Sequence, residues 1–205
     1  MNNVIAIIDY GVGNLYSVEK AFARLGADAV VTSDPAAITD AAKVVLPGVG
    51  AFGDCMSNLA DYGLADVVRE VVAKGTPLLG ICVGLQILFA GSEEDPGVPG
   101  LGIFPGMVRR LVAPGLKVPH MGWNSLEFDG SSPLFAGLPG NPYVYFVHSY
   151  HAVPDDPAMI TARTEYGGRV TAAVGRGNVH AVQFHPEKSG DVGLKILANF
   201  KELAI

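Results

Sequence analysis

Cysteine is scarce in this sequence: Cys55 and Cys82 are the only two in 205 residues. They lie too far apart to belong to a disulfide framework, and they lack the paired spacing of a zinc-binding motif. Neither a disulfide-stabilised scaffold nor a metal site is therefore expected. Cys55, at the start of a predicted helix, fits a small buried residue. Cys82 is therefore the first candidate for any reaction that needs a thiol.

Positive charge is also scarce. The chain has 14 Lys and Arg against 20 Asp and Glu, which gives a formal net charge of -6, and charged residues make up only 17% of it. A net negative charge provides no basic surface to which the phosphate backbone of a nucleic acid would bind. Nucleic-acid binding is therefore not expected.

Long apolar runs are missing as well. The longest, residues 78–90, contains a glutamine and falls short of the roughly 20 residues that a membrane span requires. The first residues reach Asp9 with no basic region before them, which indicates a β-strand and not a signal peptide. We expect a soluble, cytoplasmic protein that does not enter a membrane.

Short apolar runs are abundant, since 49% of the residues are hydrophobic. In the first half they alternate between continuous apolar runs, which predict strands, and apolar residues at helical spacing, which predict helices. The predicted strands are residues 4–9, 28–32, 43–48 and 76–82, and the predicted helices are residues 15–25 and 64–74. Strands and helices that alternate in this way are typical of parallel βαβ units covered on both faces.

The second half has a different pattern. A Gly- and Pro-rich stretch at residues 91–140 predicts loops with short strands. After it come several β-rich runs and a last predicted helix at residues 192–203. The β-rich runs are residues 143–147, 158–164, 169–174 and 179–184. The length fits one domain over residues 1–205. We expect an α/β fold: an open, mostly parallel sheet with helices on both faces, a flavodoxin-like three-layer sandwich, with antiparallel strands added in the second half.

The stretch PLLGICVGLQILFA, residues 77–90, places Cys82 between an apolar strand and a segment with helical apolar spacing. Gly80 and Gly84 on either side allow a tight turn that side chains would obstruct, as in the G-x-C-x-G form of a nucleophile elbow. A helix N-terminus favours thiolate over thiol, and the backbone N–H of Val83 could bind a developing oxyanion. Cys82 is the candidate nucleophile, although an isolated apolar cysteine is more often a core residue.

A cysteine nucleophile needs a base, and the base needs a partner that orients it. His185 follows the β-rich run at residues 179–184, and Glu187 comes two residues later, across Pro186. In an extended segment these two side chains point the same way. The sequence therefore predicts a Cys-His-Glu triad, in that chain order.

The segments GICVGLQ and QFHPEKS resemble the class I, triad-type glutamine amidotransferases. Four further segments resemble one branch of them, the glutaminase subunits of imidazole glycerol phosphate synthase in histidine biosynthesis: IIDYGVGNLYSV, LPGVGAFGDCM, PHMGWN and YFVHSY. The resemblance covers residues 7–190 and shows no departure at the triad. It implies an α/β sandwich and a single amidotransferase domain that releases ammonia from glutamine.

The resemblance also implies roles for individual residues. Cys82 would attack the side-chain amide of glutamine, and His185 would pass the proton to the leaving ammonia before water hydrolyses the glutamyl thioester. In the PGVG loop, residues 47–50, the N–H of Val49 is expected to complete the oxyanion hole after its peptide reorients, which the neighbouring glycines permit. The residues similar to those that hold glutamine are Gly50, Gln86, Glu94 and, through their backbone, Ser149 and Tyr150.

A glutaminase of this kind needs a protein that consumes its ammonia. The resemblance implies a heterodimer with a (β/α)8-barrel cyclase, whose products are imidazole glycerol phosphate and an aminoimidazole carboxamide ribonucleotide. The expected partner contacts are Met121, Trp123, Tyr145 and Lys188. An exposed tryptophan beside a methionine suits an interface, although the residues alone fit a core tryptophan equally well.

Three other interpretations of the whole chain remain. A glutaminase subunit of another synthase and a free-standing cysteine hydrolase of the same fold would share the triad. A binding module with a decayed triad would lack one of its three members, and all three are present.

Two local patterns suggest ligands that we do not expect. Gly11 and Gly13 begin a dinucleotide-binding pattern, but Tyr16 stands at the position of its third glycine, where it would block close packing. No cofactor is therefore expected. His148 and His151 are spaced like a metal pair, but no third ligand lies near them in the sequence.

Overall fold

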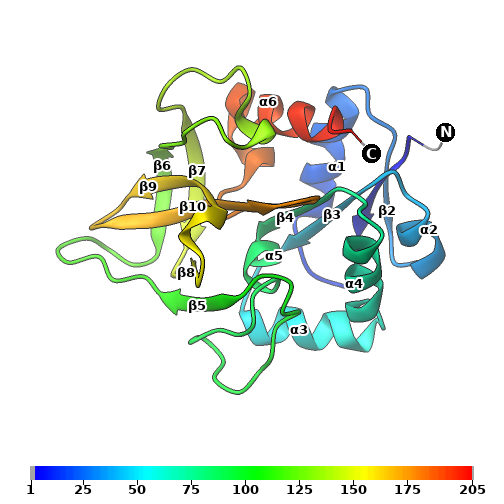
Figure 1. Cartoon of the computed structure of the whole chain (residues 1–205), viewed down its shortest axis with the longest axis horizontal. Coiled ribbons are helices and arrows are strands. Elements are labelled where there is room, and N and C mark those ends of the chain that lie inside the picture. The colour runs from blue at the N-terminus through cyan, green and yellow to red at the C-terminus, as the bar shows by residue number, and fades with distance from the viewer. Residues whose placement is uncertain (1–2, 205) are drawn as a thin grey trace.

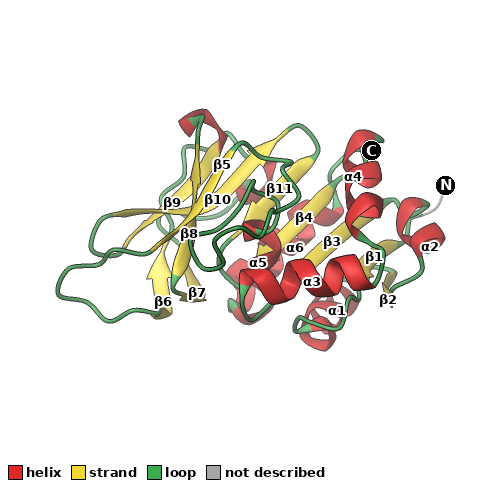
Figure 2. Ribbon diagram, turned by 90° about the horizontal axis from the view of Figure 1, so that it is seen from below, coloured by secondary structure: helices red, strands yellow, loops and turns green. Residues whose placement is uncertain are grey.

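The computed structural model describes residues 3–204, and its centre is a seven-stranded sheet with the strand order β2-β1-β3-β4-β11-β10-β9 (Figures 1 and 2). From β2 to β11 neighbouring strands run parallel, whereas β10 is antiparallel to both β11 and β9. The strands are β1 (Ile5–Ile8), β2 (Ala29–Thr32), β3 (Lys43–Gly48), β4 (Leu78–Cys82), β9 (Ile160–Glu165), β10 (Arg169–Arg176) and β11 (Val179–Val182). The predicted α/β class, with antiparallel strands added in the second half, is confirmed.

Helices cover both faces of this sheet. In Figure 1, α1 and α6 lie on one side of it, and α3 and α4 lie on the other. The α-helices are α1 (Leu15–Arg24), α2 (Pro35–Thr39), α3 (Phe52–Asp61), α4 (Ala65–Ala73), α5 (Val83–Gln86) and α6 (Gly190–Lys201), and the 3-10 helices are η1 (Pro133–Phe135), η2 (Pro157–Met159) and η3 (Pro186–Lys188). The rings of Phe22 on α1 and Phe200 on α6 lie 6.4 Å apart, centroid to centroid, which ties the first and last of these helices together.

The central strands are apolar along nearly their whole length because helices cover both of their faces. Every residue of β1, β3, β4 and β11 is buried, and such runs without polar alternation are typical of parallel strands between two helix layers. On α1, the buried positions Val18, Ala21 and Phe22 form one stripe of the helix. One continuous core reaches from Ile5 to Phe200.

Two small antiparallel sheets lie beside the β9 end of the central sheet (Figure 2). In one, β5 (Gly106–Arg110) pairs with β8 (Tyr150–Pro154), and in the other, β6 (His120–Ser125) pairs with β7 (Tyr143–His148). The sequence predicted short strands among loops in the middle of the chain, but it did not predict β8. The two sheets bring residues from the middle of the chain beside the ends of β4 and β11.

The helix predicted after Cys82 is shorter than its apolar pattern suggested. It ends at Gln86, because the loop at residues 101–103 donates hydrogen bonds to the carbonyl groups that a longer helix would use. Leu101 N–H donates to the carbonyl of Ile87 at 2.8 Å, and Ile103 N–H donates to that of Leu88 at 2.9 Å. Helical apolar spacing therefore continues past the end of the helix.

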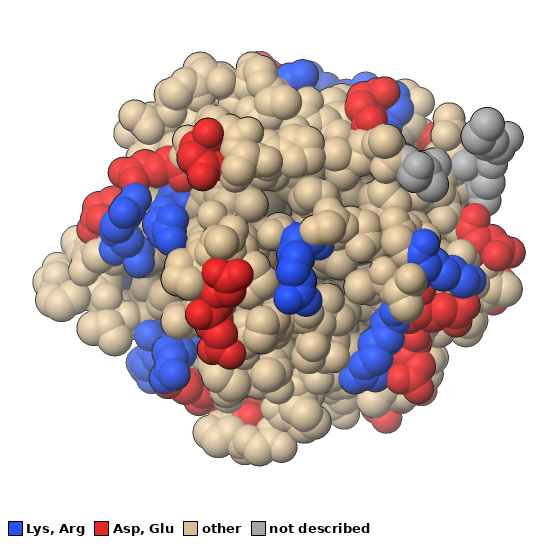
Figure 3. All heavy atoms as spheres, in the orientation of Figure 1, with Lys and Arg blue, Asp and Glu red and all other residues tan. Residues whose placement is uncertain are grey.

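Charged side chains of both signs are mixed on the surface. Lys and Arg are interspersed with Asp and Glu over the face seen in Figure 3. Ion pairs such as Arg69–Asp66 and Arg109–Glu93, each with a nitrogen–oxygen distance of 2.8 Å, join some of them. None of the helices within residues 3–204 combines the length and the apolar character needed to cross a bilayer.

Three glycines allow β3, β4 and α5 to meet backbone against backbone. A Cβ atom built on Gly84 would lie 1.9 Å from the carbonyl oxygen of Leu46, and one on Gly48 would lie 2.6 Å from the backbone nitrogen of Gly84. A Cβ on Gly80 would lie 2.9 Å from the carbonyl oxygen of Gly84. Real Cβ atoms do not approach backbone this closely, so only glycine fits at the turn that carries Cys82.

This contact gives a first prediction. Gly84→Ala should lower the free energy of unfolding by about 1–3 kcal/mol, because the rigid backbone of β3 must move to admit the methyl group. Urea denaturation measures the change. Gly140→Ala is the matched control, since nothing lies within 4 Å of its Cβ position, and it should change stability by less than about 0.5 kcal/mol. Equal stability of the two variants would contradict the close contact.

Candidate active site

Cys82 is the last residue of β4 and lies on the turn into α5. Its backbone has φ 57° and ψ -112°, in the left-handed region that a residue with a side chain rarely adopts. Strain of this kind persists only where the surroundings enforce it, and it concentrates at functional sites. The glycine contacts around the turn supply that enforcement. Because α5 has only 4 residues, its dipole gives a thiolate less support than the sequence analysis assumed.

His185 lies directly beyond β11 and is held by Glu187. His185 Nδ1 and Glu187 Oε1 are 2.9 Å apart, and the side chains are only 3% and 1% exposed. A carboxylate accepts, so Nδ1 carries the proton and Nε2 is left for the reaction. Nε2 is buried and finds no hydrogen-bond partner among residues 3–204. The Cys82 thiol is near enough to influence the ring without meeting hydrogen-bond geometry.

Electrostatics favour a protonated His185 ring. Burial alone would lower its pKa, but the interactions with Cys82 and with Glu187 outweigh burial and raise the pKa from 6.5 to about 9. The imidazole lies beside the Cys82 sulfur, and the Glu187 carboxylate orients it. The three side chains therefore have the arrangement of a candidate nucleophile, its base and an orienting acid.

The segment between His185 and Glu187 is not extended, and the prediction that it would be is wrong. Residues Pro186–Lys188 form the 3-10 helix η3, and the turn brings the carboxylate back against the imidazole. Ser189 fixes this turn, since its hydroxyl donates to the His185 carbonyl at 2.6 Å and accepts from the Tyr145 N–H at 3.0 Å. This role of Ser189 depends on β7, which is distant in the sequence, and no local signal indicated it.

A cavity of about 350 Å³ opens at Cys82 and His185, and this volume is within the range of small-ligand sites. It is lined by every residue that the sequence analysis assigned to the oxyanion hole or to glutamine: Val49, Gly50, Val83, Gln86, Glu94, Ser149 and Tyr150. Pro119, Val147 and His148 also line it, and the sequence analysis did not place them there. Segments from six parts of the chain therefore meet at one cavity.

Hydrogen bonds to other residues hold Gln86 and Glu94 in the cavity wall. Gln86 Nε2 donates to the Tyr150 carbonyl and to Gln183 Oε1, both at 3.1 Å. Gln183 in turn places its Nε2 3.8 Å from the Cys82 sulfur. Glu94 Oε2 accepts from the Phe52 N–H at 2.9 Å, at the start of α3. Gln183 is a residue that the sequence analysis missed, since only the sheet places it beside Cys82.

Two buried side chains hold the end of β3 and the loop that follows it. The Tyr10 hydroxyl donates to the Pro47 carbonyl at 2.6 Å, and the Cys55 thiol lies 3.4 Å from the Val49 carbonyl as a donor. Burial raises the pKa of Cys55 to about 11, so this thiol is an unreactive one, in line with the buried residue predicted. Gly50 has φ +93°, which a residue with a side chain would resist.

The expected partner contacts lie on neighbouring elements, β6, β7 and η3. On β6, Met121 and Trp123 are 62% and 55% exposed. Trp123 pairs across the strands with Tyr145, and their rings meet edge to face with centroids 6.2 Å apart. Lys188 is exposed on η3, which contacts β7. We call Met121, Trp123, Tyr145 and Lys188 the partner face.

The histidines considered as a metal pair have other contacts. His148 Nε2 lies 3.0 Å from His120 Nδ1, and His148 Nδ1 lies 2.9 Å from the Tyr150 carbonyl. Both nitrogens of His148 are thereby occupied. His151 lies on β8, and its Nδ1 is buried without a partner among the described residues. Over residues 3–204, no three His, Cys, Asp or Glu side chains gather as a metal site would require.

Comparisons with known proteins agree with this geometry. Residues 6–203 match the family model described as glutamine amidotransferase class-I. The chain is 56% identical to the imidazole glycerol phosphate synthase subunit HisH of Moorella thermoacetica, over 97% of this chain and 94% of that protein. It is 52% identical to the HisH subunit of Methanothermobacter thermautotrophicus, over 98% of each.

Solved structures resemble the fold at lower sequence identity. A crystal structure of a glutamine amidotransferase superposes with a TM-score of 0.75 at 24% identity, covering 97% of this chain and 99% of the other. A chain of the PurLQS structure from Thermotoga maritima superposes with a TM-score of 0.74 at 20% identity, covering 98% of each. The chain therefore belongs to the class-I glutamine amidotransferase family and, within it, to the HisH subunits of imidazole glycerol phosphate synthase.

Proposed function

We propose that this glutamine amidotransferase hydrolyses the side-chain amide of glutamine at Cys82. The ammonia then serves a cyclase subunit, which makes imidazole glycerol phosphate and an aminoimidazole carboxamide ribonucleotide in histidine biosynthesis. The observation that carries the proposal is the meeting of a strained Cys82 and the His185–Glu187 pair at one cavity. The identity of about half its residues with HisH subunits supports the pathway.

The first half of the reaction releases ammonia. With the Cys82 proton held on His185 Nε2, the sulfur attacks the amide carbon of glutamine to give a tetrahedral intermediate. His185 then returns the proton to the amide nitrogen, the carbon–nitrogen bond breaks, and ammonia leaves a glutamyl thioester behind. Glu187 keeps Nδ1 protonated and stabilises the positive ring throughout.

The second half returns the enzyme to its starting state. A water molecule replaces ammonia, His185 Nε2 takes one of its protons, and the resulting hydroxide attacks the thioester carbon. When the carbon–sulfur bond breaks, glutamate leaves and the sulfur regains its proton from His185. Each proton therefore moves through the same nitrogen, which explains why Nε2 has no other partner among residues 3–204.

The oxyanion hole combines a fixed donor with a movable one. The Val83 N–H, at the start of α5, is the fixed donor, and the Val49 N–H completes the hole once its peptide turns. Glycines on both sides of Val49 permit such a turn, while Tyr10 and Cys55 hold the loop in its resting form. A missing oxyanion donor typically slows a reaction about 100- to 1000-fold.

The partner is proposed to be a (β/α)8-barrel cyclase that binds the partner face. On this face, the exposed side chains of Met121 and Trp123 suit an interface, because methionine and tryptophan are enriched at interfaces. We further propose that residues 1–205 act as one amidotransferase domain. The free thiols of Cys55 and Cys82 suit the reducing cytoplasm.

Two other functions are less well supported. A free-standing cysteine hydrolase would have no need of the exposed Trp123 and Met121 beside its catalytic cavity. A glutaminase for a different synthase would fit the fold equally, but the structural matches named after other synthases share only 17–20% of residues with this chain, against 49–56% for the HisH subunits.

Replacing the nucleophile separates the two activities of the complex. Cys82→Ser should lower glutamine-dependent synthesis at least about 10⁴-fold, because the nucleophile is lost, while synthesis from added ammonia stays unchanged. Steady-state assays with each nitrogen source measure this. Cys55→Ser is the control and should keep glutamine use, since a hydroxyl can still donate to Val49. Equal loss of both activities in Cys82→Ser would contradict the division of labour.

Partner dependence gives the third prediction. The purified chain alone should produce glutamate from glutamine about 100- to 1000-fold more slowly than the complex with the cyclase subunit and its nucleotide ligand, because we propose that the Val49 N–H completes the oxyanion hole only in the complex. Glutamate release, followed by a coupled assay, measures both rates. Fast hydrolysis that the cyclase leaves unchanged would favour the free-standing hydrolase.

The His185 pKa gives a prediction with a definite sign. A pKa raised to about 9 means that the protonated ring stabilises the fold. That contribution is complete below the ordinary value of about 6.5 and is lost as the pH rises through about 9. Glu187→Gln should lower the pKa of His185, as measured by NMR titration of the ring. It should also lower the unfolding free energy most at the acid end of that window.

A matched control isolates the cause of that shift. Glu93→Gln removes an exposed carboxylate that interacts with Arg109 and His151, and it should leave the pKa of His185 where it is. An unchanged His185 pKa in Glu187→Gln would show that Glu187 is not what raises it.

A further inference from the structure

A line of hydrogen bonds runs from β6 to the wall of the active-site cavity. Asn124 Nδ2 lies 3.2 Å from His120 Nε2, and His120 Nδ1 lies 3.0 Å from His148 Nε2. His148 Nδ1 lies 2.9 Å from the carbonyl oxygen of Tyr150. We call Asn124, His120, His148 and this carbonyl the histidine chain.

The inner end of the histidine chain fixes the direction of every bond in it. A carbonyl oxygen can only accept, so His148 carries its proton on Nδ1, and its neutral ring accepts at Nε2. His120 must then donate from Nδ1 and accept at Nε2, where the Asn124 amide donates. Burial lowers the pKa of His120 to about 4 and is the main cause that lowers the pKa of His148 to about 3, so both rings are neutral at neutral pH.

Packing alone does not explain two histidines at these positions. The His120 ring is stacked between Tyr166 and Phe146, with centroid distances of 3.9 and 4.6 Å. A phenylalanine would fill such a stack without the cost of taking polar nitrogens out of water. The nitrogens of His120 and His148 therefore need a role that apolar contact does not supply.

The outer end of the histidine chain belongs to the strand that carries the partner face. Residues alternate sides along a strand, so His120 and Asn124 point to one side of β6 while Met121 and Trp123 point to the other. Met121 and Trp123 are exposed, whereas His120 is buried. A protein that seats on the partner face therefore presses on the strand that positions His120.

The inner end belongs to the segment proposed to hold glutamine. His148, Ser149 and Tyr150 line the active-site cavity. The Tyr150 carbonyl that accepts from His148 also accepts from Gln86 Nε2 at 3.1 Å. The Tyr150 carbonyl oxygen thus connects the histidine chain to Gln86, which lies in the cavity wall one helical turn beyond Cys82.

We propose that His120 and His148 are positioning residues that couple the partner face to the segment that holds glutamine. The inference rests on the proposed function, since it adds a regulatory part to the same cavity. Each hydrogen bond in the histidine chain has one fixed donor and one fixed acceptor. A shift of β6 must therefore carry His148 and the Tyr150 carbonyl with it, or leave a buried nitrogen without a partner, which is unfavourable.

His120→Phe tests the coupling, because the new ring keeps the stack on Phe146 and Tyr166 but cannot donate to His148. In the complex with the cyclase subunit and its nucleotide ligand, we expect the KM for glutamine to rise and the stimulation by the partner to fall about tenfold. Calorimetric titration should show unchanged affinity for the cyclase. His120→Asn, whose amide can replace the Nδ1 donor, should restore most of the stimulation.

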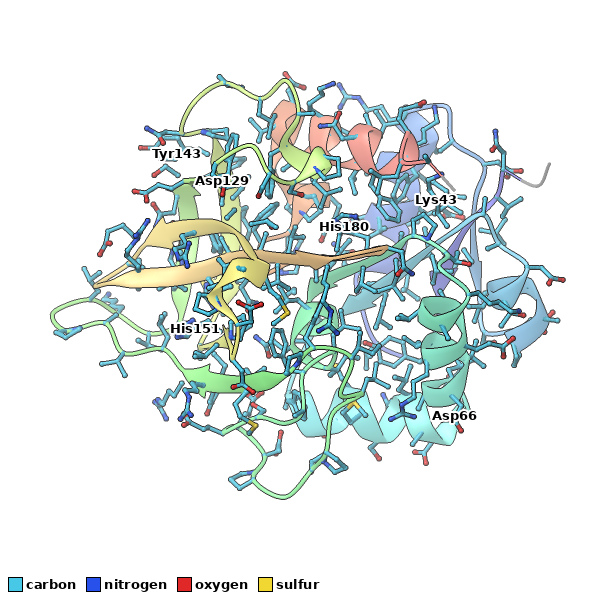
Figure 4. All side chains as sticks on the ribbon, viewed as in Figure 1. Lys43, Asp66, Asp129, Tyr143, His151 and His180 are labelled. Carbon is cyan, nitrogen blue, oxygen red and sulfur yellow. The ribbon has the colours of Figure 1, made fainter. Side chains whose placement is uncertain are left out.

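His180→Asn is the matched control for removing a buried histidine. His180 lies on β11 in the central sheet (Figure 4), and its Nδ1 has no partner among the described residues. This variant should keep the full stimulation. Equal stimulation in His120→Phe and the unaltered protein would overturn the coupling, as would equal losses in the Phe and Asn variants. An unaltered complex without glutaminase activity would instead overturn the proposed function, before any variant is compared.

A measurement on the unaltered protein tests the histidine chain without relying on a variant that folds. Long-range ¹H–¹⁵N NMR spectra at neutral pH should show the proton on Nδ1 in both His120 and His148. Adding the cyclase subunit should shift the Nε2 signal of His148. A proton on Nε2 of either ring, or signals that the cyclase leaves unmoved, would overturn the inference.

Discussion

The active site depends on one close contact, in which the backbone of Gly84 lies against the carbonyl group of Leu46. This contact presses α5 onto the end of β3 and forces Cys82 into its left-handed backbone conformation. It also sets the loop of Val49 beside the sulfur, since Gly48 pairs with Cys82 in the sheet. Cys82 and the proposed oxyanion donor, Val49, are thereby positioned by the same packing of glycines.

The base comes from the other half of the chain and is positioned differently. His185 leaves the central sheet after β11, but its backbone is bound to β7, both directly through Tyr145 and through Ser189. β7 pairs in turn with β6, the strand of the partner face. The cysteine therefore belongs to the rigid parallel sheet, whereas the histidine is shared between that sheet and the hairpin that is proposed to meet the cyclase.

The elements that sequence reasoning predicted well are those decided by local pattern. Buried parallel strands are continuous apolar runs, so β1, β3 and β4 were found within two residues of their ends. The short helix α2 was missed although Asp34 caps it through the Ala36 N–H, because five residues carry too little periodicity to count. The end of α5 could not be predicted, since a loop some fifteen residues downstream determines it.

The same division holds at the site. The sequence indicated Cys82, His185 and Glu187 because glycines and a strand end surround them, but it assumed the wrong backbone between the last two. It missed Gln183 and Ser189, whose roles arise from strands brought together only by folding. Spacing in the sequence identifies groups that react, whereas the groups that position them come from distant strands.

Glu94 carries a consequence for selectivity among amides. One of its oxygens is bound by the first N–H of α3, and its carboxylate still has acceptor capacity at the cavity wall. A free amino acid brings a cationic α-amino group that such a wall can pair with. A glutamine residue inside a peptide has that nitrogen acylated, so it would leave the remaining acceptor capacity of the carboxylate without a cationic partner, which is unfavourable. If glutamine binds at this wall as proposed, Glu94 would favour the free amino acid over the glutamine side chains of proteins.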